Sequence, residues 1–279
     1  MTKETNETPT TPRRQETAVC SKEAVKALAK TRPHTIRRLF MSEDTVKGFG
    51  ELCTFLAREH KFYRIAREDE LEKLSGTVHH QGVVAMIEDT KLQPLGNASS
   101  VKKDGKAILL DDIGDDHNIG AIARTAAFFG FDTMILTGSK SKLTPGMYRV
   151  ARGGLEYISV YYAESAADAI KACPHRLKFA ADAHEGVPLK SLFAKNGVKA
   201  ETRQSSDRRP SRAPDRREDR GKSGGCLLVL GNEERGLSSQ VLKACPDRVK
   251  IHGSSVIESL NVVQAATILM YELSEHLKA

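Results

Sequence analysis

Hydrophobic positions between residues 20 and 90 alternate between helical spacing and strand-like runs. Apolar residues recur every three or four positions in some segments and form short continuous runs in others. The predicted helices cover 22–30, 46–59 and 68–74, and the predicted strands cover 35–41, 62–66 and 83–87. This alternation predicts a small α/β domain over residues 20–90. Residues 1–19 have few side chains to bury, so we expect a disordered tail there.

A second α/β pattern follows a lysine-rich linker over residues 91–105 and extends over residues 106–279. Its predicted strands cover 107–110, 133–136, 157–161, 178–181 and 226–230, and its predicted helices cover 119–129, 165–172 and 259–277. Residues 200–224 interrupt this pattern. Within them, Glu201–Lys222 holds eight basic and five acidic residues and no Val, Leu, Ile or Phe. We expect a disordered basic insertion, which either touches RNA or serves as a solvated spacer.

Composition narrows the classes of partner. The 43 Lys and Arg against 36 Asp and Glu give a net charge of +7, which is compatible with a nucleic acid. The five cysteines are widely spaced and form no C-x-x-C pair, so we expect no disulfide framework and no metal site. No apolar run is long enough to span a membrane, and the first residues lack the apolar core of a secretory signal. These features predict a cytoplasmic protein.

The first segment with candidate functional residues lies between the predicted strand 107–110 and the predicted helix 119–129. Asn118 is a possible cap of this helix, and Arg124 follows six residues later. A Rossmann loop is disfavoured, because Gly114 and Gly120 do not form G-x-G-x-x-G and acidic residues crowd the loop. Spacing alone favours a structural role for Arg124 over a catalytic one.

Two further polar turns follow strands near the C-terminus. One is the turn Gly231-Asn-Glu233-Glu-Arg-Gly236, whose glycines allow either a close ligand or a sharp bend. The other is a Gly/Ser loop from Ile251 to Asn261, with Ser259 near the cap of the last helix. The glycine turn is explained equally well by a bend of the backbone and by a ligand. For Ser259 and Asn261, helix capping is a better explanation than ligand binding.

Taken in order, the three segments resemble the signature motifs of the SpoU (TrmH) RNA methyltransferases of the SPOUT superfamily. The matching residues are Asn118-x-x-x-x-x-Arg124 with Phe129-Gly130, Leu230-Gly231-Asn-Glu233-x-x-Gly236-Leu-Ser238, and Ser259-Leu260-Asn261-Val262. Residues 20–90, including the stretch His80–Ala85, also resemble the small substrate-binding domain that precedes many of these enzymes. The resemblance covers nearly all residues that we expect to be ordered.

The resemblance implies a C-terminal trefoil-knotted α/β domain, a homodimer, and transfer of a methyl group from S-adenosyl-L-methionine to a ribose 2′-hydroxyl of tRNA or rRNA. In such an enzyme Arg124 contacts and activates the hydroxyl, Asn118 orients Arg124 or the ribose, and Glu233 fixes the site through hydrogen bonds. Ser259 and Asn261 complete the pocket. The implied cofactor-binding residues are Gly231, Ile251 and Leu260.

Two departures from the family pattern border the implied cofactor pocket. His252 follows Ile251 where Pro is common, and Val263 stands where Ser is common. One alternative is a non-catalytic RNA-binding protein with the same fold, which would not bind the cofactor. Another is a knotted enzyme that methylates a base.

Overall fold

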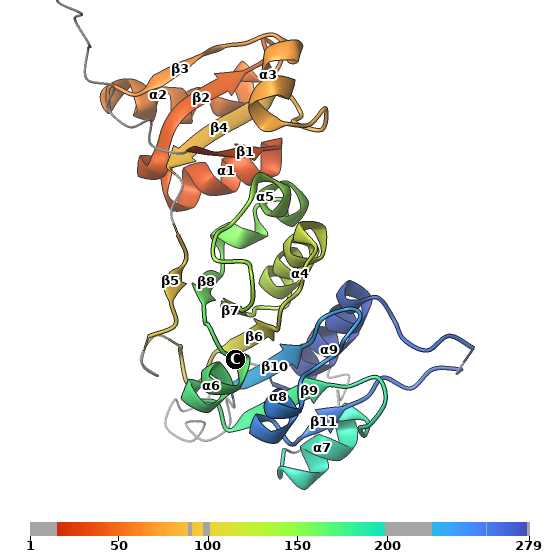
Figure 1. Cartoon of the computed structure of the whole chain (residues 1–279). Coiled ribbons are helices and arrows are strands. Elements are labelled where there is room, and N and C mark those ends of the chain that lie inside the picture. Colours follow the sequence, from red (N-terminus) through yellow and green to blue (C-terminus); the bar gives the residue numbers. More distant parts are fainter. Residues whose placement is uncertain (1–15, 89–90, 97–100, 199–224, 255, 278–279) are drawn as a thin grey trace, which may run out of the picture. The chain divides into compact units, whose positions relative to one another are not determined.

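The structure is a computed structural model that describes residues 16–88, 91–96, 101–198, 225–254 and 256–277. The chain divides into two compact units, Met1–Thr90 and Lys91–Ala279 (Figure 1). Residues 1–15 of the predicted tail and the predicted insertion 200–224 lie outside the described residues.

The first unit is built on a four-stranded sheet with the order β1-β4-β2-β3. The strands are β1 (Glu16–Cys20), β2 (Ile36–Met41), β3 (Phe62–Ile65) and β4 (Val83–Glu88). β1 corrects the prediction of a tail through residue 19. Its residues pair antiparallel with β4 from Glu16 to Cys20, and Val19 is completely buried. Only the partner strand, which lies far along the chain, makes this short segment a strand.

Three helices accompany this sheet, α1 (Lys22–Thr31), α2 (Gly50–Arg58) and α3 (Glu68–Ser75). α3 covers a cluster in which Leu71 packs with Phe40 and Val84. The turn before β4 is fixed by His80, which is buried and accepts a hydrogen bond at Nδ1 from the backbone N–H of Gly82 at 3.1 Å. Gly82 has φ +74°, a conformation that favours glycine, so the turn requires this residue.

The second unit contains a seven-stranded sheet with the order β11-β9-β10-β6-β7-β8-β5, and every pair of neighbours is parallel. The strands are β5 (Gln93–Pro94), β6 (Lys106–Leu110), β7 (Thr133–Leu136), β8 (Ser159–Tyr162), β9 (Leu177–Ala181), β10 (Cys226–Leu230) and β11 (Arg248–Val249). β6 and β10 lie side by side near the middle. Their continuous apolar sequences follow from burial on both faces.

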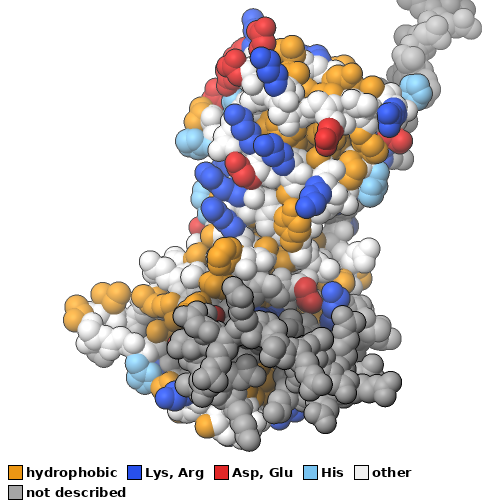
Figure 2. Space-filling view, turned by 180° about the vertical axis from the view of Figure 1, so that it is seen from behind, with side chains coloured by type: hydrophobic (Ala, Val, Ile, Leu, Met, Phe, Trp, Pro, Cys, Tyr) orange, Lys and Arg blue, Asp and Glu red, His pale blue; other side chains and the backbone are white. Residues whose placement is uncertain are grey.

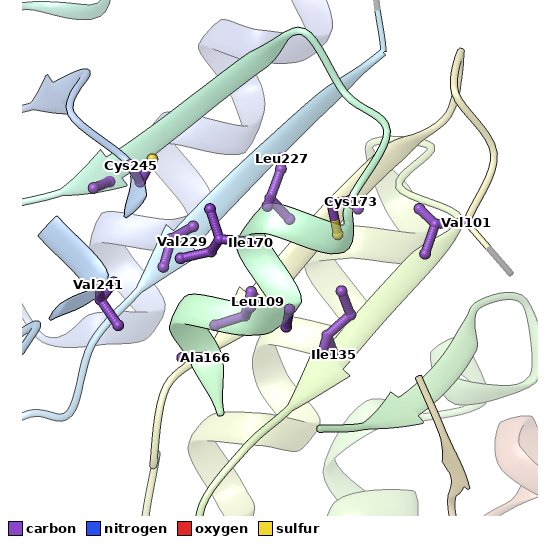
Figure 3. Close-up of a cluster of buried hydrophobic side chains, with 13 residues drawn as sticks. Val101, Leu109, Ile135, Ala166, Ile170, Cys173, Leu227, Val229, Val241 and Cys245 are labelled. Atoms are coloured by element: carbon purple, nitrogen blue, oxygen red, sulfur yellow. The ribbon is translucent and has the colours of Figure 1, made fainter. Parts of the chain in front are cut away.

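Helices cover both faces of this sheet (Figure 1). They are α4 (Asp116–Phe128), α5 (Pro145–Ala151), α6 (Ala166–Ala172), α7 (Leu189–Lys195), α8 (Ser239–Ala244) and α9 (Val262–His276). On one face, Leu109 and Val229 of the sheet pack with Ile170 of α6 and Val241 of α8 (Figure 3). On the other, α9 contacts α4 and β10. Alternate strand residues therefore supply two apolar layers.

The structure differs from the predicted elements at several places in this unit. β5 and the buried Val101 fall within the predicted linker 91–105, because Gln93 and Pro94 pair with β8. Helices α5, α7 and α8, each of six or seven residues, were not predicted. α4 begins at Asp116 and α9 at Val262, so both differ from their predicted starts by three residues.

Candidate functional site

The candidate site lies at the carboxyl ends of β6 and β10, which are neighbouring parallel strands. After β6 the chain runs through α4 to β7 on one side, whereas after β10 it runs through α8 to β11 on the other. The two connections therefore leave in opposite directions. In open parallel sheets, ligands bind in the crevice formed at such a switch point. The first and second sequence motifs both begin there.

Asn118 and Glu233 meet at this switch point. The side-chain amide of Asn118 donates from Nδ2 to Oε1 of Glu233 at 2.8 Å, which joins two motifs separated by 115 positions. Asn118 is the third residue of α4 and does not cap it. The cap is Asp115, whose side chain accepts from the backbone N–H of His117 at 2.8 Å, so the predicted capping role of Asn118 is wrong. This frees Asn118 to bind across the site.

The turn that carries Glu233 is fastened to the loop after β6. Asn232 donates from Nδ2 to the carbonyl of Asp112 at 2.8 Å, and its Oδ1 accepts from the backbone N–H groups of Glu234 and Arg235 at 3.0 and 3.1 Å. Arg235 also forms an ion pair with Asp112. Sequence reasoning missed Asn232, although an Asn just after a glycine turn is a residue type that often bonds to its own backbone.

Gly231 is required by close backbone packing in the same turn. A Cβ at this position would lie 2.5 Å from the carbonyl carbon and 2.7 Å from the carbonyl oxygen of Gly236. Any side chain would therefore open the turn and displace Glu233. Sequence reasoning left the role of these glycines open between a ligand and a bend, and the structure provides the bend.

Arg124 lies on the same helix as Asn118 but points in another direction. Six residues at about 100° each place the two side chains roughly 120° apart around α4, with the small side chain of Ala121 between them. Arg124 is exposed, and within the described ranges no residue forms a hydrogen bond or ion pair with its guanidinium. Asn118 therefore does not orient Arg124 by direct contact in this structure.

The third motif supplies the start of α9. Asn261 caps this helix, and its Oδ1 accepts from the backbone N–H of Val263 at 2.8 Å. Ser259, predicted near the cap, lies two residues earlier and is exposed, as is Leu260, whereas Ile251 is half-buried. Among the residues that the structure describes, no hydrogen bond joins this segment to Asn118 or Glu233.

Two aspartates beside the crevice have opposite pKa shifts. Burial raises the pKa of Asp111, and the Asp112 carboxylate adds to this rise, against a hydrogen bond from Thr137 and the charge of Arg235. At Asp116, burial also favours the neutral form, but hydrogen bonds from Lys140 and Thr144, each 2.6 Å long, prevail and lower the pKa. Asp116 therefore remains a carboxylate that fastens the start of α4.

In the described part of the chain, no group of three or more His, Cys, Asp or Glu side chains is placed to hold a metal ion. Nor is any helix there long and apolar enough to cross a membrane. A further candidate for ligand binding is the backbone after β11. No hydrogen bond between described residues uses the peptide groups of residues 251–254.

Comparisons with known proteins agree with this arrangement. Residues 105–271 match the model of the SpoU rRNA Methylase family, and residues 22–93 match the model described as RNA 2'-O ribose methyltransferase substrate binding. A 23S rRNA (guanosine-2'-O-)-methyltransferase from Acinetobacter baylyi is 30% identical over 89% of this chain and 93% of its own length. An uncharacterized tRNA/rRNA methyltransferase from Haemophilus influenzae is also 30% identical, over 67% of this chain and 54% of that protein. The chain thus spans about half the length of that relative.

Solved structures support the fold of both units. The AdoMet-bound rRNA methyltransferase from Sinorhizobium meliloti has a TM-score of 0.70 at 18% identity and covers 95% of this chain and 88% of its own. The SpoU methyltransferase AviRb from Streptomyces viridochromogenes has a TM-score of 0.66 at 21% identity and covers 93% and 89%. The α/β fold with a parallel sheet is therefore confirmed. The family match extends over most of the second unit, and the chain belongs to the SpoU rRNA methylase family.

Proposed function

We propose that this protein transfers a methyl group from S-adenosyl-L-methionine to a ribose 2′-hydroxyl of tRNA or rRNA. The observation that carries the proposal is the hydrogen bond between Asn118 and Glu233 at the switch point of the sheet. Less than two turns farther along the same helix lies Arg124, which has no partner among the described residues. An RNA substrate also suits a net charge of +7 and the many exposed Lys and Arg side chains visible in Figure 2.

The chain offers a backbone-lined site for the cofactor, with Gly231, Ile251 and Leu260 as its proposed contacts. The peptide groups of residues 251–254 are not used by other described residues, so their N–H and C=O groups are available to an adenine ring. The half-buried Ile251 and exposed Leu260 provide apolar contact. When bound, S-adenosyl-L-methionine would supply an electrophilic methyl group on a sulfonium.

The residues of the chain would position the hydroxyl and stabilise the charge that develops on it. The ribose oxygen would accept the methyl group that the cofactor supplies, and the hydroxyl proton would leave to solvent. Arg124 carries a guanidinium, a group that donates hydrogen bonds and does not act as a base. It therefore acts by holding the hydroxyl and its neighbouring phosphate and by stabilising oxyanion character.

Asn118 has a second polar atom for the substrate. Its Nδ2 is engaged by Glu233, which fixes the orientation of the amide and leaves Oδ1 as an acceptor for a ribose hydroxyl. Ser259 and Asn261 would complete the pocket from the third motif. The Nδ2 of Asn261 remains available as a donor, because its helix cap uses Oδ1.

The test is the substitution Arg124→Ala. We expect loss of methyl transfer to RNA, measured with a radiolabelled methyl donor, while the Kd for S-adenosyl-L-methionine, measured by calorimetry, stays within about twofold. The RNA is the tRNA or rRNA fraction from cells that lack this protein. Lys243→Ala is the control, because Lys243 is exposed on α8. Unchanged turnover in Arg124→Ala would refute the role of Arg124.

The chemical product separates the alternatives. Digestion of the modified RNA to nucleosides should give a 2′-O-methyl ribose, and a methylated base would refute the proposed acceptor. A wild-type protein that binds RNA but does not bind S-adenosyl-L-methionine would instead be a non-catalytic RNA-binding protein.

We also infer a homodimer formed through α4 and α9. Phe128 is 81% exposed, and Tyr271 and Ile268 of α9 are 51% and 37% exposed. The ring of Phe129 lies 6.0 Å from that of Tyr271, so the two helices present one apolar surface. Such a patch is characteristic of an association site. Phe128→Glu should shift the mass in sedimentation equilibrium from two copies to one; an unchanged mass would contradict this interface.

The remaining inferences concern the path of the chain and the location of the protein. We infer a trefoil knot in the second unit, supported by the family resemblance and by α9, which returns to pack on α4 and β10. A crystal structure that traces residues 225–277 tests this. A cytoplasmic location is supported by the RNA substrate and by five cysteines that all remain free thiols.

A further inference from the structure

Four arginines of the second unit form no ion pair with any described carboxylate, and three of the four belong to one region. This unit has six described arginines. Arg235 and Arg248 form ion pairs with acidic residues, and Arg176 donates to the carbonyl of Asn196. The other three donate to neither a carboxylate nor a backbone carbonyl within the described ranges, namely Arg124, Arg149 and Arg152. They lie on α4, on α5 and in the turn that ends α5.

Two glycines bring these elements unusually close together. A Cβ at Gly120 would lie 2.7 Å from the carbonyl oxygen of Met147, so α5 rests directly on the backbone of α4. A Cβ at Gly154, at the start of the 3-10 helix η4 (Gly154–Glu156), would lie 2.8 Å from Cα of Arg124. Both contacts are possible only without side chains at these two positions. The turn that follows α5 is therefore held against Arg124.

The exposed face of α4 links Arg124 to Arg149 through His117. His117 and Arg124 are seven residues apart, so they share one face of the helix and are separated by roughly 10 Å along its axis. Nη2 of Arg149 lies 2.8 Å from Nε2 of His117. Arginine is always a donor, so the imidazole accepts this bond and fixes the guanidinium at the N-terminal end of the same face. The other N–H donors of the Arg149 guanidinium, about four, remain available to a ligand.

Arg152 is held in a strained conformation at the other end of α5. It has φ +45° and ψ +45°, in the left-handed region that non-glycine residues seldom adopt, and its side chain is exposed. Such conformations cost roughly 1–3 kcal/mol and cluster at ligand sites. Gly153 and Gly154 follow directly, so a third glycine at position 152 would relieve the strain, yet the chain has an arginine there.

We propose that Arg124, Arg149 and Arg152 together bind successive backbone phosphates of the substrate RNA. This proposal rests on the proposed function, because it places the phosphates beside the hydroxyl that Arg124 engages. The planar fork of an arginine matches the oxygens of a phosphate, and no carboxylate in the described residues competes for it. Arg149 and Arg152 thus hold the strand, and Arg124 alone lies near the reacting atoms.

The test compares Arg149→Gln and Arg152→Gln with the control Lys243→Gln, which removes one exposed positive charge on α8. Methyl transfer is measured at several concentrations of the tRNA or rRNA fraction from cells that lack this protein. Each arginine variant should raise KM for RNA by about 10-fold, the effect of losing one charge-assisted hydrogen bond, with a much smaller change in kcat. Each should also reduce the slope of log KM against log salt by about one.

An unchanged KM and salt slope in both arginine variants, with an active wild-type protein, would overturn the proposal. So would an equal effect in Lys243→Gln, which would indicate general charge attraction. Thermal unfolding and binding of S-adenosyl-L-methionine confirm that the variants are folded, and Arg149→Lys should recover only part of the loss, because lysine lacks the fork. If the wild-type protein transfers no methyl group to RNA, the proposed function fails instead. In that case, filter binding of the same RNA fractions to the same variants tests RNA binding by Arg149 and Arg152 without reference to catalysis. Unchanged binding in both variants would overturn the proposal.

Discussion

Gly120→Ala should destabilise the second unit, although the same change stabilises most helices. In an exposed helix interior, alanine is favoured over glycine by roughly 1 kcal/mol. Here the added Cβ would lie 2.7 Å from the carbonyl oxygen of Met147 and 3.0 Å from Cβ of Val150. Relief requires α5 to move as a backbone unit, and overpacking of this kind costs about 1–3 kcal/mol. Since the nearest atom is backbone, we expect the upper part of that range and a net loss of about 1–2 kcal/mol.

Thermal unfolding followed by calorimetry measures this loss. For a unit of this size, about 1–2 kcal/mol corresponds to a decrease in Tm of roughly 2–8 °C. Gly114→Ala is the matched control, because Gly114 precedes the same helix, has open space at the Cβ position and does not adopt a left-handed φ. That variant should keep or slightly raise the Tm. A Tm for Gly120→Ala at or above that of the wild-type protein would refute the tight contact between α4 and α5.

Two other predictions concern ionisable groups. The lowered pKa of Asp116 means that its charged form stabilises the fold above its unfolded pKa of about 4, and that this stability is lost as pH falls through the lower folded pKa. Asp116→Asn should therefore be less stable than the wild type at pH 7 by roughly 1 kcal/mol in urea unfolding, with a gap that closes in acid; a constant gap would contradict this. Burial raises the pKa of Cys226 and Cys245 to about 12, and Cys20 and Cys173 are buried as well. Only the half-buried Cys53 should therefore react readily with a thiol reagent in the native protein. Rapid reaction of either buried thiol before denaturant is added would contradict their placement.

The sequence predicted the parts of the fold that have a local cause. The strand 226–230 was predicted at its observed bounds, because a continuous apolar run needs only burial on both faces. β1 was missed because it depends on pairing with β4, which lies far along the chain. The start of α4 was misplaced because Asp115 and Asn118 are both good capping residues. Only the structure shows that Asp115 accepts the hydrogen bond.

The candidate site was predictable as a set of residues but not as an arrangement. Asn118 and Glu233 could be selected from the motif resemblance, yet their hydrogen bond depends on β6 and β10 being neighbours, which no local pattern reveals. The positions of Arg149 and Arg152 were not predicted at all. The feature that places them is the close packing of Gly120 and Gly154, and the sequence does not show which atoms these glycines contact.

The entry of β10 into the sheet has a consequence for protein engineering. The strand begins at Cys226, at the end of the strand opposite to the Asn118 and Glu233 pair, and Gly225 separates it from the segment 199–224. The five residues of β10 separate this end of the strand from the turn at Gly231 by about 17 Å. A fluorescent label or an affinity tag introduced before Gly225 would therefore be attached one strand length away from Asn118 and Glu233.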